Sequence, residues 1–125
     1  MYVFVTNKIR SLESVPFKVR AQIEDSIFSV HSNIAEGYSR RSIKEYIQFI
    51  NIWLSSLAEN YSQTFSLNSV GDIDRNWFDE YDKKHYSVEN KLIQMNKTMI
   101  SKLEKNNWKN DYVLREIVEK YKAES

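Results

Sequence analysis

Residues that interrupt helices are scarce in this chain. Among 125 residues there are 2 Gly and 1 Pro. An all-β protein of this length needs many turns, and turns depend heavily on Gly and Pro. The scarcity therefore predicts a few long helices. The 42% hydrophobic content is enough for one core.

Composition also excludes several kinds of chemistry. The chain has no Cys, which excludes thiolate catalysis, disulfides and cysteine zinc sites. The net charge is +1, so any binding of nucleic acid needs a local basic patch. No apolar run reaches the roughly 18 residues that span a bilayer, and the first residues lack the pattern of a signal peptide. We therefore expect a cytoplasmic protein.

Hydrophobic periodicity divides the chain into helical segments. The expected helices span about residues 2–14, 16–38, 42–70 and 75–105. Short connections between them predict an all-α, up-down antiparallel four-helix bundle with a short first helix, comprising residues 1–106. An amphipathic piece at about 111–122 predicts an extra short helix within a C-terminal extension, residues 107–125. We expect this piece to cover the part of the bundle that the short first helix does not reach.

Local signals support these boundaries. Ser42 and Glu45 form a capping box at the start of the third helix. Asp72 or Asp74 is suited to cap the fourth helix. Gly37 lies where a left-handed helix C-cap is expected.

Each long helix carries an apolar stripe that predicts its buried side. In the second helix the stripe is Val19, Ile23, Ile27, Val30 and Ile34. In the third it is Ile43, Tyr46, Ile47, Ile50, Trp53, Leu54, Leu57, Tyr61 and Phe65. In the fourth it is Phe78, Tyr81, His85, Val88, Leu92, Met95, Met99 and Leu103.

Three motifs between residues 22 and 59 carry a family resemblance. Residues 29–37 read Ser-Val-His-Ser-Asn-Ile-Ala-Glu-Gly. Residues 40–45 read Arg-Arg-Ser-Ile-Lys-Glu, and residues 56–59 read Ser-Leu-Ala-Glu. In order and spacing these motifs resemble those of a bacterial four-helix-bundle family related to the proteins encoded in ribosomal RNA intervening sequences.

The resemblance implies an assembly and a set of partners. It implies a ring-shaped homopentamer, and kinship with the accessory proteins of diversity-generating retroelements, which work with a reverse transcriptase and RNA. It implies no catalytic residue and no cofactor, so we expect a protein that is not an enzyme. No small-molecule substrate is indicated.

Small and polar residues form one side of the second helix, about 100° from its apolar stripe. The signature and seam residues are Gln22, Ser26, Ser29, Asn33, Glu36 and Gly37, with Glu59 from the third helix. We interpret this side as a polar seam inside the bundle or between subunits, because small residues let another helix approach closely. A ligand or RNA groove is the alternative. A catalytic role for Asn33 and Glu36 is the least supported, because no acid–base partner or pocket is indicated.

Basic residues gather at two places and are candidates for binding nucleic acid. Arg40, Arg41 and Lys44 cluster at the turn before the third helix, whose N-terminus favours phosphate. Lys84, Lys91, Lys102 and Lys105 share one flank of the fourth helix. The alternatives are a solvated turn with a charged rim for the first set and a solvated helix face for the second.

Two further groups have structural and functional interpretations. Phe49, Ile52 and Trp53 widen the apolar arc of the third helix, which predicts an oligomer contact or, alternatively, a fully wrapped core helix. Asp82 and His85 form an Asp-x-x-His pair, but a di-iron bundle needs two Glu-x-x-His motifs and two further Glu residues. We therefore expect no metal, and interpret His85 as a core-edge histidine.

The resulting hypothesis is a homo-oligomeric helical scaffold or adaptor that binds RNA or a nucleoprotein partner through a basic rim. The alternative is a protein-interaction or structural module without nucleic-acid binding. The sequence indicates no membrane partner.

Overall fold

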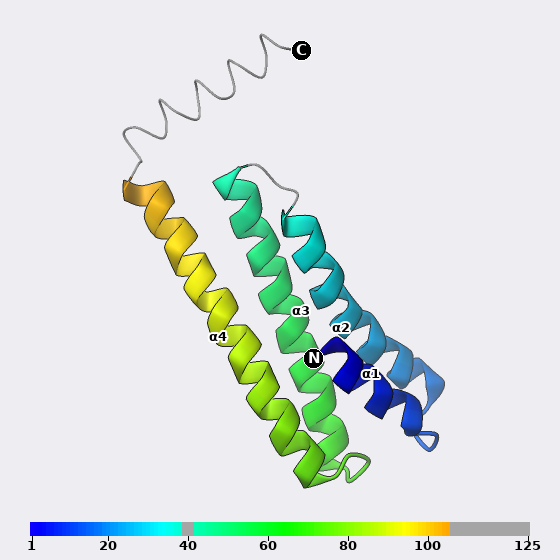
Figure 1. Cartoon of the computed structure of the whole chain (residues 1–125). Coiled ribbons are helices and arrows are strands. Elements are labelled where there is room, and N and C mark those ends of the chain that lie inside the picture. The colour runs from blue at the N-terminus through cyan, green and yellow to red at the C-terminus, as the bar shows by residue number, and fades with distance from the viewer. Residues whose placement is uncertain (39–41, 106–125) are drawn as a thin grey trace, which may run out of the picture.

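The chain folds as an all-α four-helix bundle, as predicted (Figure 1). The computed structural model describes residues 1–38 and 42–105, apart from the side chains of residues 33–38. The helices are α1 (Tyr2–Ser11), α2 (Phe17–Tyr38), α3 (Ile43–Ser69) and α4 (Arg75–Lys105). α2 packs on α1 and α3, and α3 packs on α4. The extra helix expected at about 111–122 lies outside the described residues.

Side-chain caps fix the starts of α3 and α4. The Ser42 hydroxyl accepts a hydrogen bond from the Glu45 backbone N–H at 3.0 Å, as the capping box predicted. Of the two candidates for α4, Asp74 is the cap, because its carboxylate accepts from the Trp77 N–H at 3.2 Å. This bond, followed by the Lys8 side chain, lowers the pKa of Asp74. Gly71 adopts a φ of 86° in the intervening turn, a conformation that favours glycine.

The expected end of the first helix was wrong by a few residues, and the expected C-cap position of Gly37 was wrong, although α2 ends at Tyr38 as predicted. α1 ends at Ser11 rather than near residue 14, because Leu12 and Val15 form a turn closed by a 3.1 Å backbone hydrogen bond. Val15 is buried, and Pro16 disfavours helical backbone at the residue before it. Gly37 lies inside α2, one residue before its end, rather than after it.

The buried side chains form two clusters. The first is Val5, Ile9, Val15, Ile23, Ile27, Leu67, Ile73, Phe78 and Tyr81. The second is Val30, Ile50, Trp53, Leu57 and Leu92. Many of these buried residues belong to the predicted stripes, which confirms the stripes at those positions: Ile23, Ile27, Val30, Ile50, Trp53, Leu57, Phe78, Tyr81 and Leu92.

Phe65 departs from the predicted stripe of the third helix. It is 51% exposed, and its ring stacks on the ring of Tyr61 and meets that of Phe78 edge to face at the edge of the core. His85 is 7% exposed, which agrees with its interpretation as a core-edge residue.

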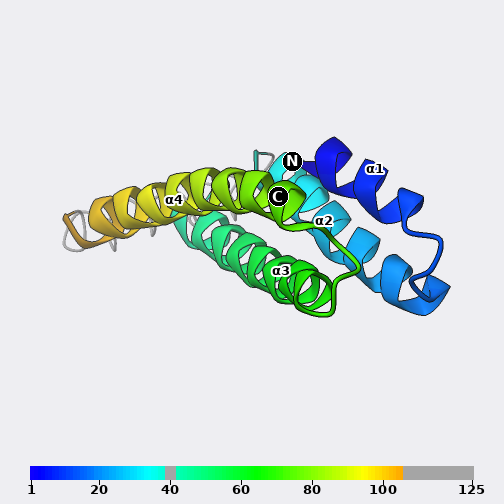
Figure 2. The ribbon, with the colours of Figure 1, turned by 90° about the horizontal axis from the view of Figure 1, so that it is seen from below.

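The short α1 covers only one half of the bundle. It lies along the half that contains the start of α2 and the end of α3 (Figures 1 and 2). Where α1 begins, a cavity of about 200 Å³ opens, lined by Met1, Tyr2, Ile27, Val30, His31 and Val88. Beyond this point the described bundle consists of α2, α3 and α4 only. None of the described helices is both long and apolar enough to cross a membrane.

Candidate functional site

A buried carboxamide lies at the centre of the contact between α2 and α3. Asn60 is 0% exposed and occupies the inward side of α3, between Leu57 and Thr64. Its Nδ2 donates to the Ile23 carbonyl oxygen at 3.2 Å and to the Ser26 hydroxyl oxygen at 3.0 Å. Both acceptors belong to α2, so one side chain bridges the two helices.

The network continues into α4 through Tyr81. Its hydroxyl donates to the Asn60 carboxamide oxygen at 2.6 Å, and Tyr81 is fully buried. Burial raises the pKa of the Tyr81 phenol, because the phenolate would lose its hydration. The hydroxyl therefore stays protonated and able to donate. Asn60 thus joins three helices with all its polar groups satisfied, which is what a buried polar network needs to be stabilising.

The network also reaches the surface. The Ser26 hydroxyl, 4% exposed, lies 2.7 Å from Gln63 Oε1, and Gln63 Nε2 donates to Glu59 at 3.4 Å. The Ser29 and Ser56 hydroxyls share a hydrogen bond at 3.0 Å. A shallow depression of about 210 Å³ lies over this edge, lined by Gln22, Asp25, Ser26, Ser29, Ser56 and Glu59.

The structure brings together most of the signature residues whose side chains it describes. Ser26 and Ser29 belong to the α2–α3 network, while Gln22 and Glu59 lie at its exposed rim. Sequence reasoning missed Asn60 and Gln63 of α3, and it placed Tyr81 in the buried stripe of the fourth helix without its hydrogen bond to Asn60. A polar residue at an inward position of α3 was the available signal for Asn60. The side chains of Asn33 and Glu36 lie outside the described part, as does the environment of Gly37.

The candidate nucleic-acid residues lie at the surface where they are described. Lys44, Lys84, Lys91, Lys102 and Lys105 are exposed, as the sequence pattern implied. The first turn of α3 and the last turn of α4 lie at the same end of the bundle, which brings Lys44 to the same end as Lys102 and Lys105 (Figure 1).

At the other end of α4 the lysine flank has a local partner. Lys84 lies nearer the start of α4, with its Nζ 5.0 Å from the centre of the Phe4 ring. Arg40 and Arg41 lie outside the described residues.

The three residues expected to form an oligomer contact differ in burial. Trp53 is 1% exposed within the single chain and packs in the second cluster, so for this residue the core interpretation holds. Phe49 is half-buried, and Ile52 is 45% exposed. Ile52 is therefore the most exposed of the three.

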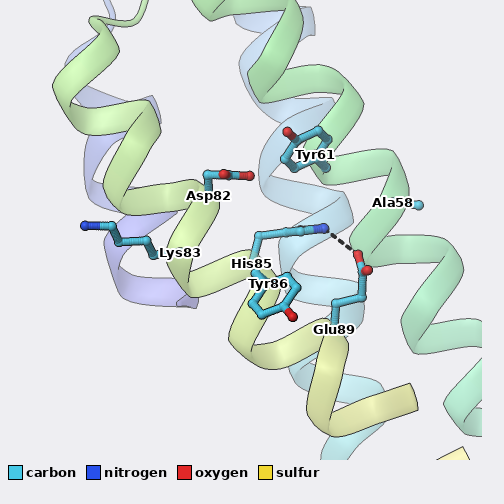
Figure 3. Close-up of a pocket in the computed structure, with 7 residues that line it drawn as sticks. All are labelled: Ala58, Tyr61, Asp82, Lys83, His85, Tyr86 and Glu89. Carbon is cyan, nitrogen blue, oxygen red and sulfur yellow. Dashed lines mark hydrogen bonds and ion pairs between the residues drawn. The ribbon is translucent and has the colours of Figure 1, made fainter. Parts of the chain in front are cut away.

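A larger pocket of about 490 Å³ lies between α3 and α4 (Figure 3). It is lined by Ala58, Tyr61, Asp82, Lys83, His85, Tyr86 and Glu89. His85 Nε2 lies 2.8 Å from a Glu89 carboxylate oxygen. Among the described residues no group of His, Cys, Asp or Glu side chains is arranged to hold a metal ion.

Fold and seam together define a helical-bundle protein in which the signature residues Ser26 and Ser29 hydrogen-bond across the contact between α2 and α3. A family model described as 23S rRNA-intervening sequence protein matches residues 2–94, which is most of the chain. The chain belongs to this family. No curated protein and no solved structure gives a significant match.

Proposed function

We propose that this protein is a non-enzymatic homo-oligomeric scaffold or adaptor that contacts RNA or a nucleoprotein partner through its basic residues. The observation that carries the proposal is the outer α2–α3 face. There, the small and polar rim of the seam lies beside the exposed side chain of Ile52.

The composition of this face favours contact with a second copy. On α3, Ile52 lies about 40° from Ser56 and about 20° from Glu59 at roughly 100° per residue. Ser56, like Ser29 opposite it, is small enough to let another helix approach closely. An exposed Ile beside such a surface gains by burial, at roughly 25 cal/mol per Å² of apolar area. The resemblance to the ring-forming family makes five subunits the expected number.

The hydrogen bonds of the seam support the proposal that the protein is not an enzyme. Asn60, Ser26 and Tyr81 hydrogen-bond to one another, and Asn60 is closed off from solvent. Such groups have no free position from which to bind or activate a substrate. They stabilise the helix arrangement instead.

The RNA contact is supported by charge placement and by family. Lys44, Lys102 and Lys105 are exposed at one end of the bundle. The N-terminus of α3, capped by Ser42, adds backbone donors there. A ring would repeat this end in every subunit, and weak phosphate contacts would then add up. The family description also refers to ribosomal RNA.

The near-neutral charge favours a second candidate, a protein-interaction module without nucleic-acid binding. The two candidates are separated by measuring the binding of fluorescent single-stranded and hairpin RNA between 50 and 300 mM salt. The proposal predicts affinity that falls steeply with salt, as expected when several phosphates are contacted. Absence of salt-dependent binding to both RNAs would favour the protein-interaction module.

A further inference from the structure

The pocket between α3 and α4 is built from residues at helical spacing. On α4, Asp82, His85, Tyr86 and Glu89 follow the pattern i, i+3, i+4, i+7 and so share one face. On α3, Ala58 and Tyr61 are three residues apart and lie opposite this face. The small side chain of Ala58 leaves space between the helices. The resulting hollow is open to solvent and bounded by both helices (Figure 3).

Hydrogen-bond acceptors dominate this pocket. Asp82 and Glu89 contribute carboxylates, and Figure 3 shows the Asp82 carboxylate directed toward Tyr61 and the Glu89 carboxylate directed toward His85. Lys83 is the one lining residue that is always cationic, and its ammonium group extends away from the others in Figure 3. Burial, followed by the charge of Asp82 and a hydrogen bond to it, raises the pKa of the Tyr61 phenol. The pocket is therefore electronegative and disfavours an anion.

The histidine in the pocket has unused bonding capacity. His85 is 7% exposed, its Nε2 pairs with Glu89, and its Nδ1 is buried without a hydrogen-bond partner among the described residues. When Nε2 donates to the Glu89 carboxylate, Nδ1 is a further bare acceptor. A group with donors only suits these surroundings.

Aromatic rings form the walls beside the carboxylates. The Tyr61 ring centre lies 4.6 Å from that of His85, and Tyr86 is 68% exposed at the mouth of the pocket. Faces of aromatic rings attract cations, and a planar guanidinium stacks on them better than an ammonium group does. An exposed Tyr is also a frequent anchor of protein interfaces.

We propose that this pocket binds the guanidinium group of an arginine side chain presented by a partner protein. The guanidinium has five N–H donors and no acceptor, which matches the two carboxylates, and the one lysine ammonium of the lining, that of Lys83, points away from them. It would lie between the Tyr61 and Tyr86 rings and pair with Asp82 and Glu89. This inference is independent of the proposed RNA contact, because none of the candidate RNA-binding lysines lines the pocket.

The test titrates the full-length protein with each of three capped tripeptides, and NMR detects the binding. The peptides are Gly-Arg-Gly, Gly-Lys-Gly and Gly-citrulline-Gly. Citrulline has nearly the shape of arginine but no charge. The arginine peptide is expected to shift the amide signals of Ala58, Asp82 and Glu89 with millimolar affinity, roughly the range for one exposed ion pair with cation–π contact. The lysine peptide should bind several-fold more weakly, and the citrulline peptide at least tenfold more weakly.

Two matched pairs of variants locate the site. The double variant Asp82→Asn, Glu89→Gln should weaken binding of the arginine peptide at least tenfold. The control double variant Asp79→Asn, Glu80→Gln removes the same charge from α4 outside the pocket and should change this affinity little. Ala58→Phe should block binding by filling the pocket, and Ser55→Phe places the same ring elsewhere on α3. Far-UV circular dichroism checks that each variant is folded.

Several results would overturn the inference. The first is the absence of any signal shift at tens of millimolar peptide. The second is binding of the citrulline or lysine peptide that equals binding of the arginine peptide. The third is equal weakening of arginine-peptide binding by both pairs of carboxylate variants. Tighter binding of free L-arginine than of the peptide would overturn the assignment to a protein side chain, because it would indicate a small-molecule ligand.

Discussion

The Tyr81 hydroxyl donates a 2.6 Å hydrogen bond to the carboxamide oxygen of Asn60, and both residues are 0% exposed. Asn60 in turn donates to Ser26 and to the backbone of α2. A single buried amide therefore links α2, α3 and α4.

Removing the Tyr81 hydroxyl should destabilise the bundle. Tyr81→Phe keeps the ring but leaves the Asn60 carboxamide oxygen buried without a donor, which costs about 1–3 kcal/mol. Urea unfolding monitored by circular dichroism measures this change. Tyr86→Phe, at a residue that is 68% exposed, is the matched control and should leave the midpoint unchanged. Equal midpoints for the two variants would show that the contact contributes nothing.

The same phenol should make the fold sensitive to alkaline pH. Burial raises the pKa of Tyr81 in the folded state, and the unfolded value is about 10. A raised folded pKa means that the unfolded chain loses its proton first. This contribution to stability is complete below pH 10 and is lost progressively above it. Unfolding midpoints measured from pH 8 to pH 11 should fall more steeply in the unmodified protein than in Tyr81→Phe.

Ile52 should contribute to assembly. Ile52→Glu places a charge on the outer α2–α3 face and should dissociate the oligomer while keeping the helical content. Phe17→Glu is the control, because Phe17 is also an exposed apolar residue but lies on another side of α2, about 120° from Ser29. Sedimentation velocity distinguishes the two. Dissociation by both substitutions, or by neither, would contradict the role of this face.

Charge reversal should separate the two candidate RNA surfaces. Arg40→Glu combined with Arg41→Glu should remove salt-dependent RNA binding without changing helical content or subunit number. Lys91→Glu combined with Lys102→Glu tests the flank of α4. Loss of binding in the lysine variant alone would place the RNA contact on that flank and contradict a contribution from Arg40 and Arg41.

The C-terminal extension should cover the half of the bundle that α1 leaves bare. This expectation concerns residues outside the described part and stays a prediction. Deleting residues 106–125 should lower the unfolding midpoint and increase binding of an apolar dye. Ile117→Glu should have the same effect in the full chain, whereas Glu119→Gln, at a polar position of the predicted helix, should not. An unchanged midpoint after deletion would show that the extension does not pack on the bundle.

Sequence periodicity was sufficient for the helices but not for the contacts between them. The stripe of α4 was predicted correctly because Phe78, Tyr81 and Leu92 repeat at helical spacing and are buried. Asn60 was missed because a polar residue interrupts the apolar pattern of α3, and its role depends on Tyr81 of a different helix.

The pocket and the oligomer surface show the same limit. Asp82, His85 and Glu89 share a face by spacing alone, but their position opposite Tyr61 depends on the register between α3 and α4. Trp53 was placed both in the buried stripe of the third helix and in the candidate outer contact, because a wide apolar arc does not reveal which of its members the other helices cover. The structure places this side chain in the core.

The central claim is that the protein functions as an assembly of identical chains. Light scattering coupled to size exclusion, at micromolar concentrations of the unmodified protein, tests it most directly. The account predicts a molar mass several times that of one chain, with five chains expected from the resemblance. A molar mass equal to one chain across this range would contradict it.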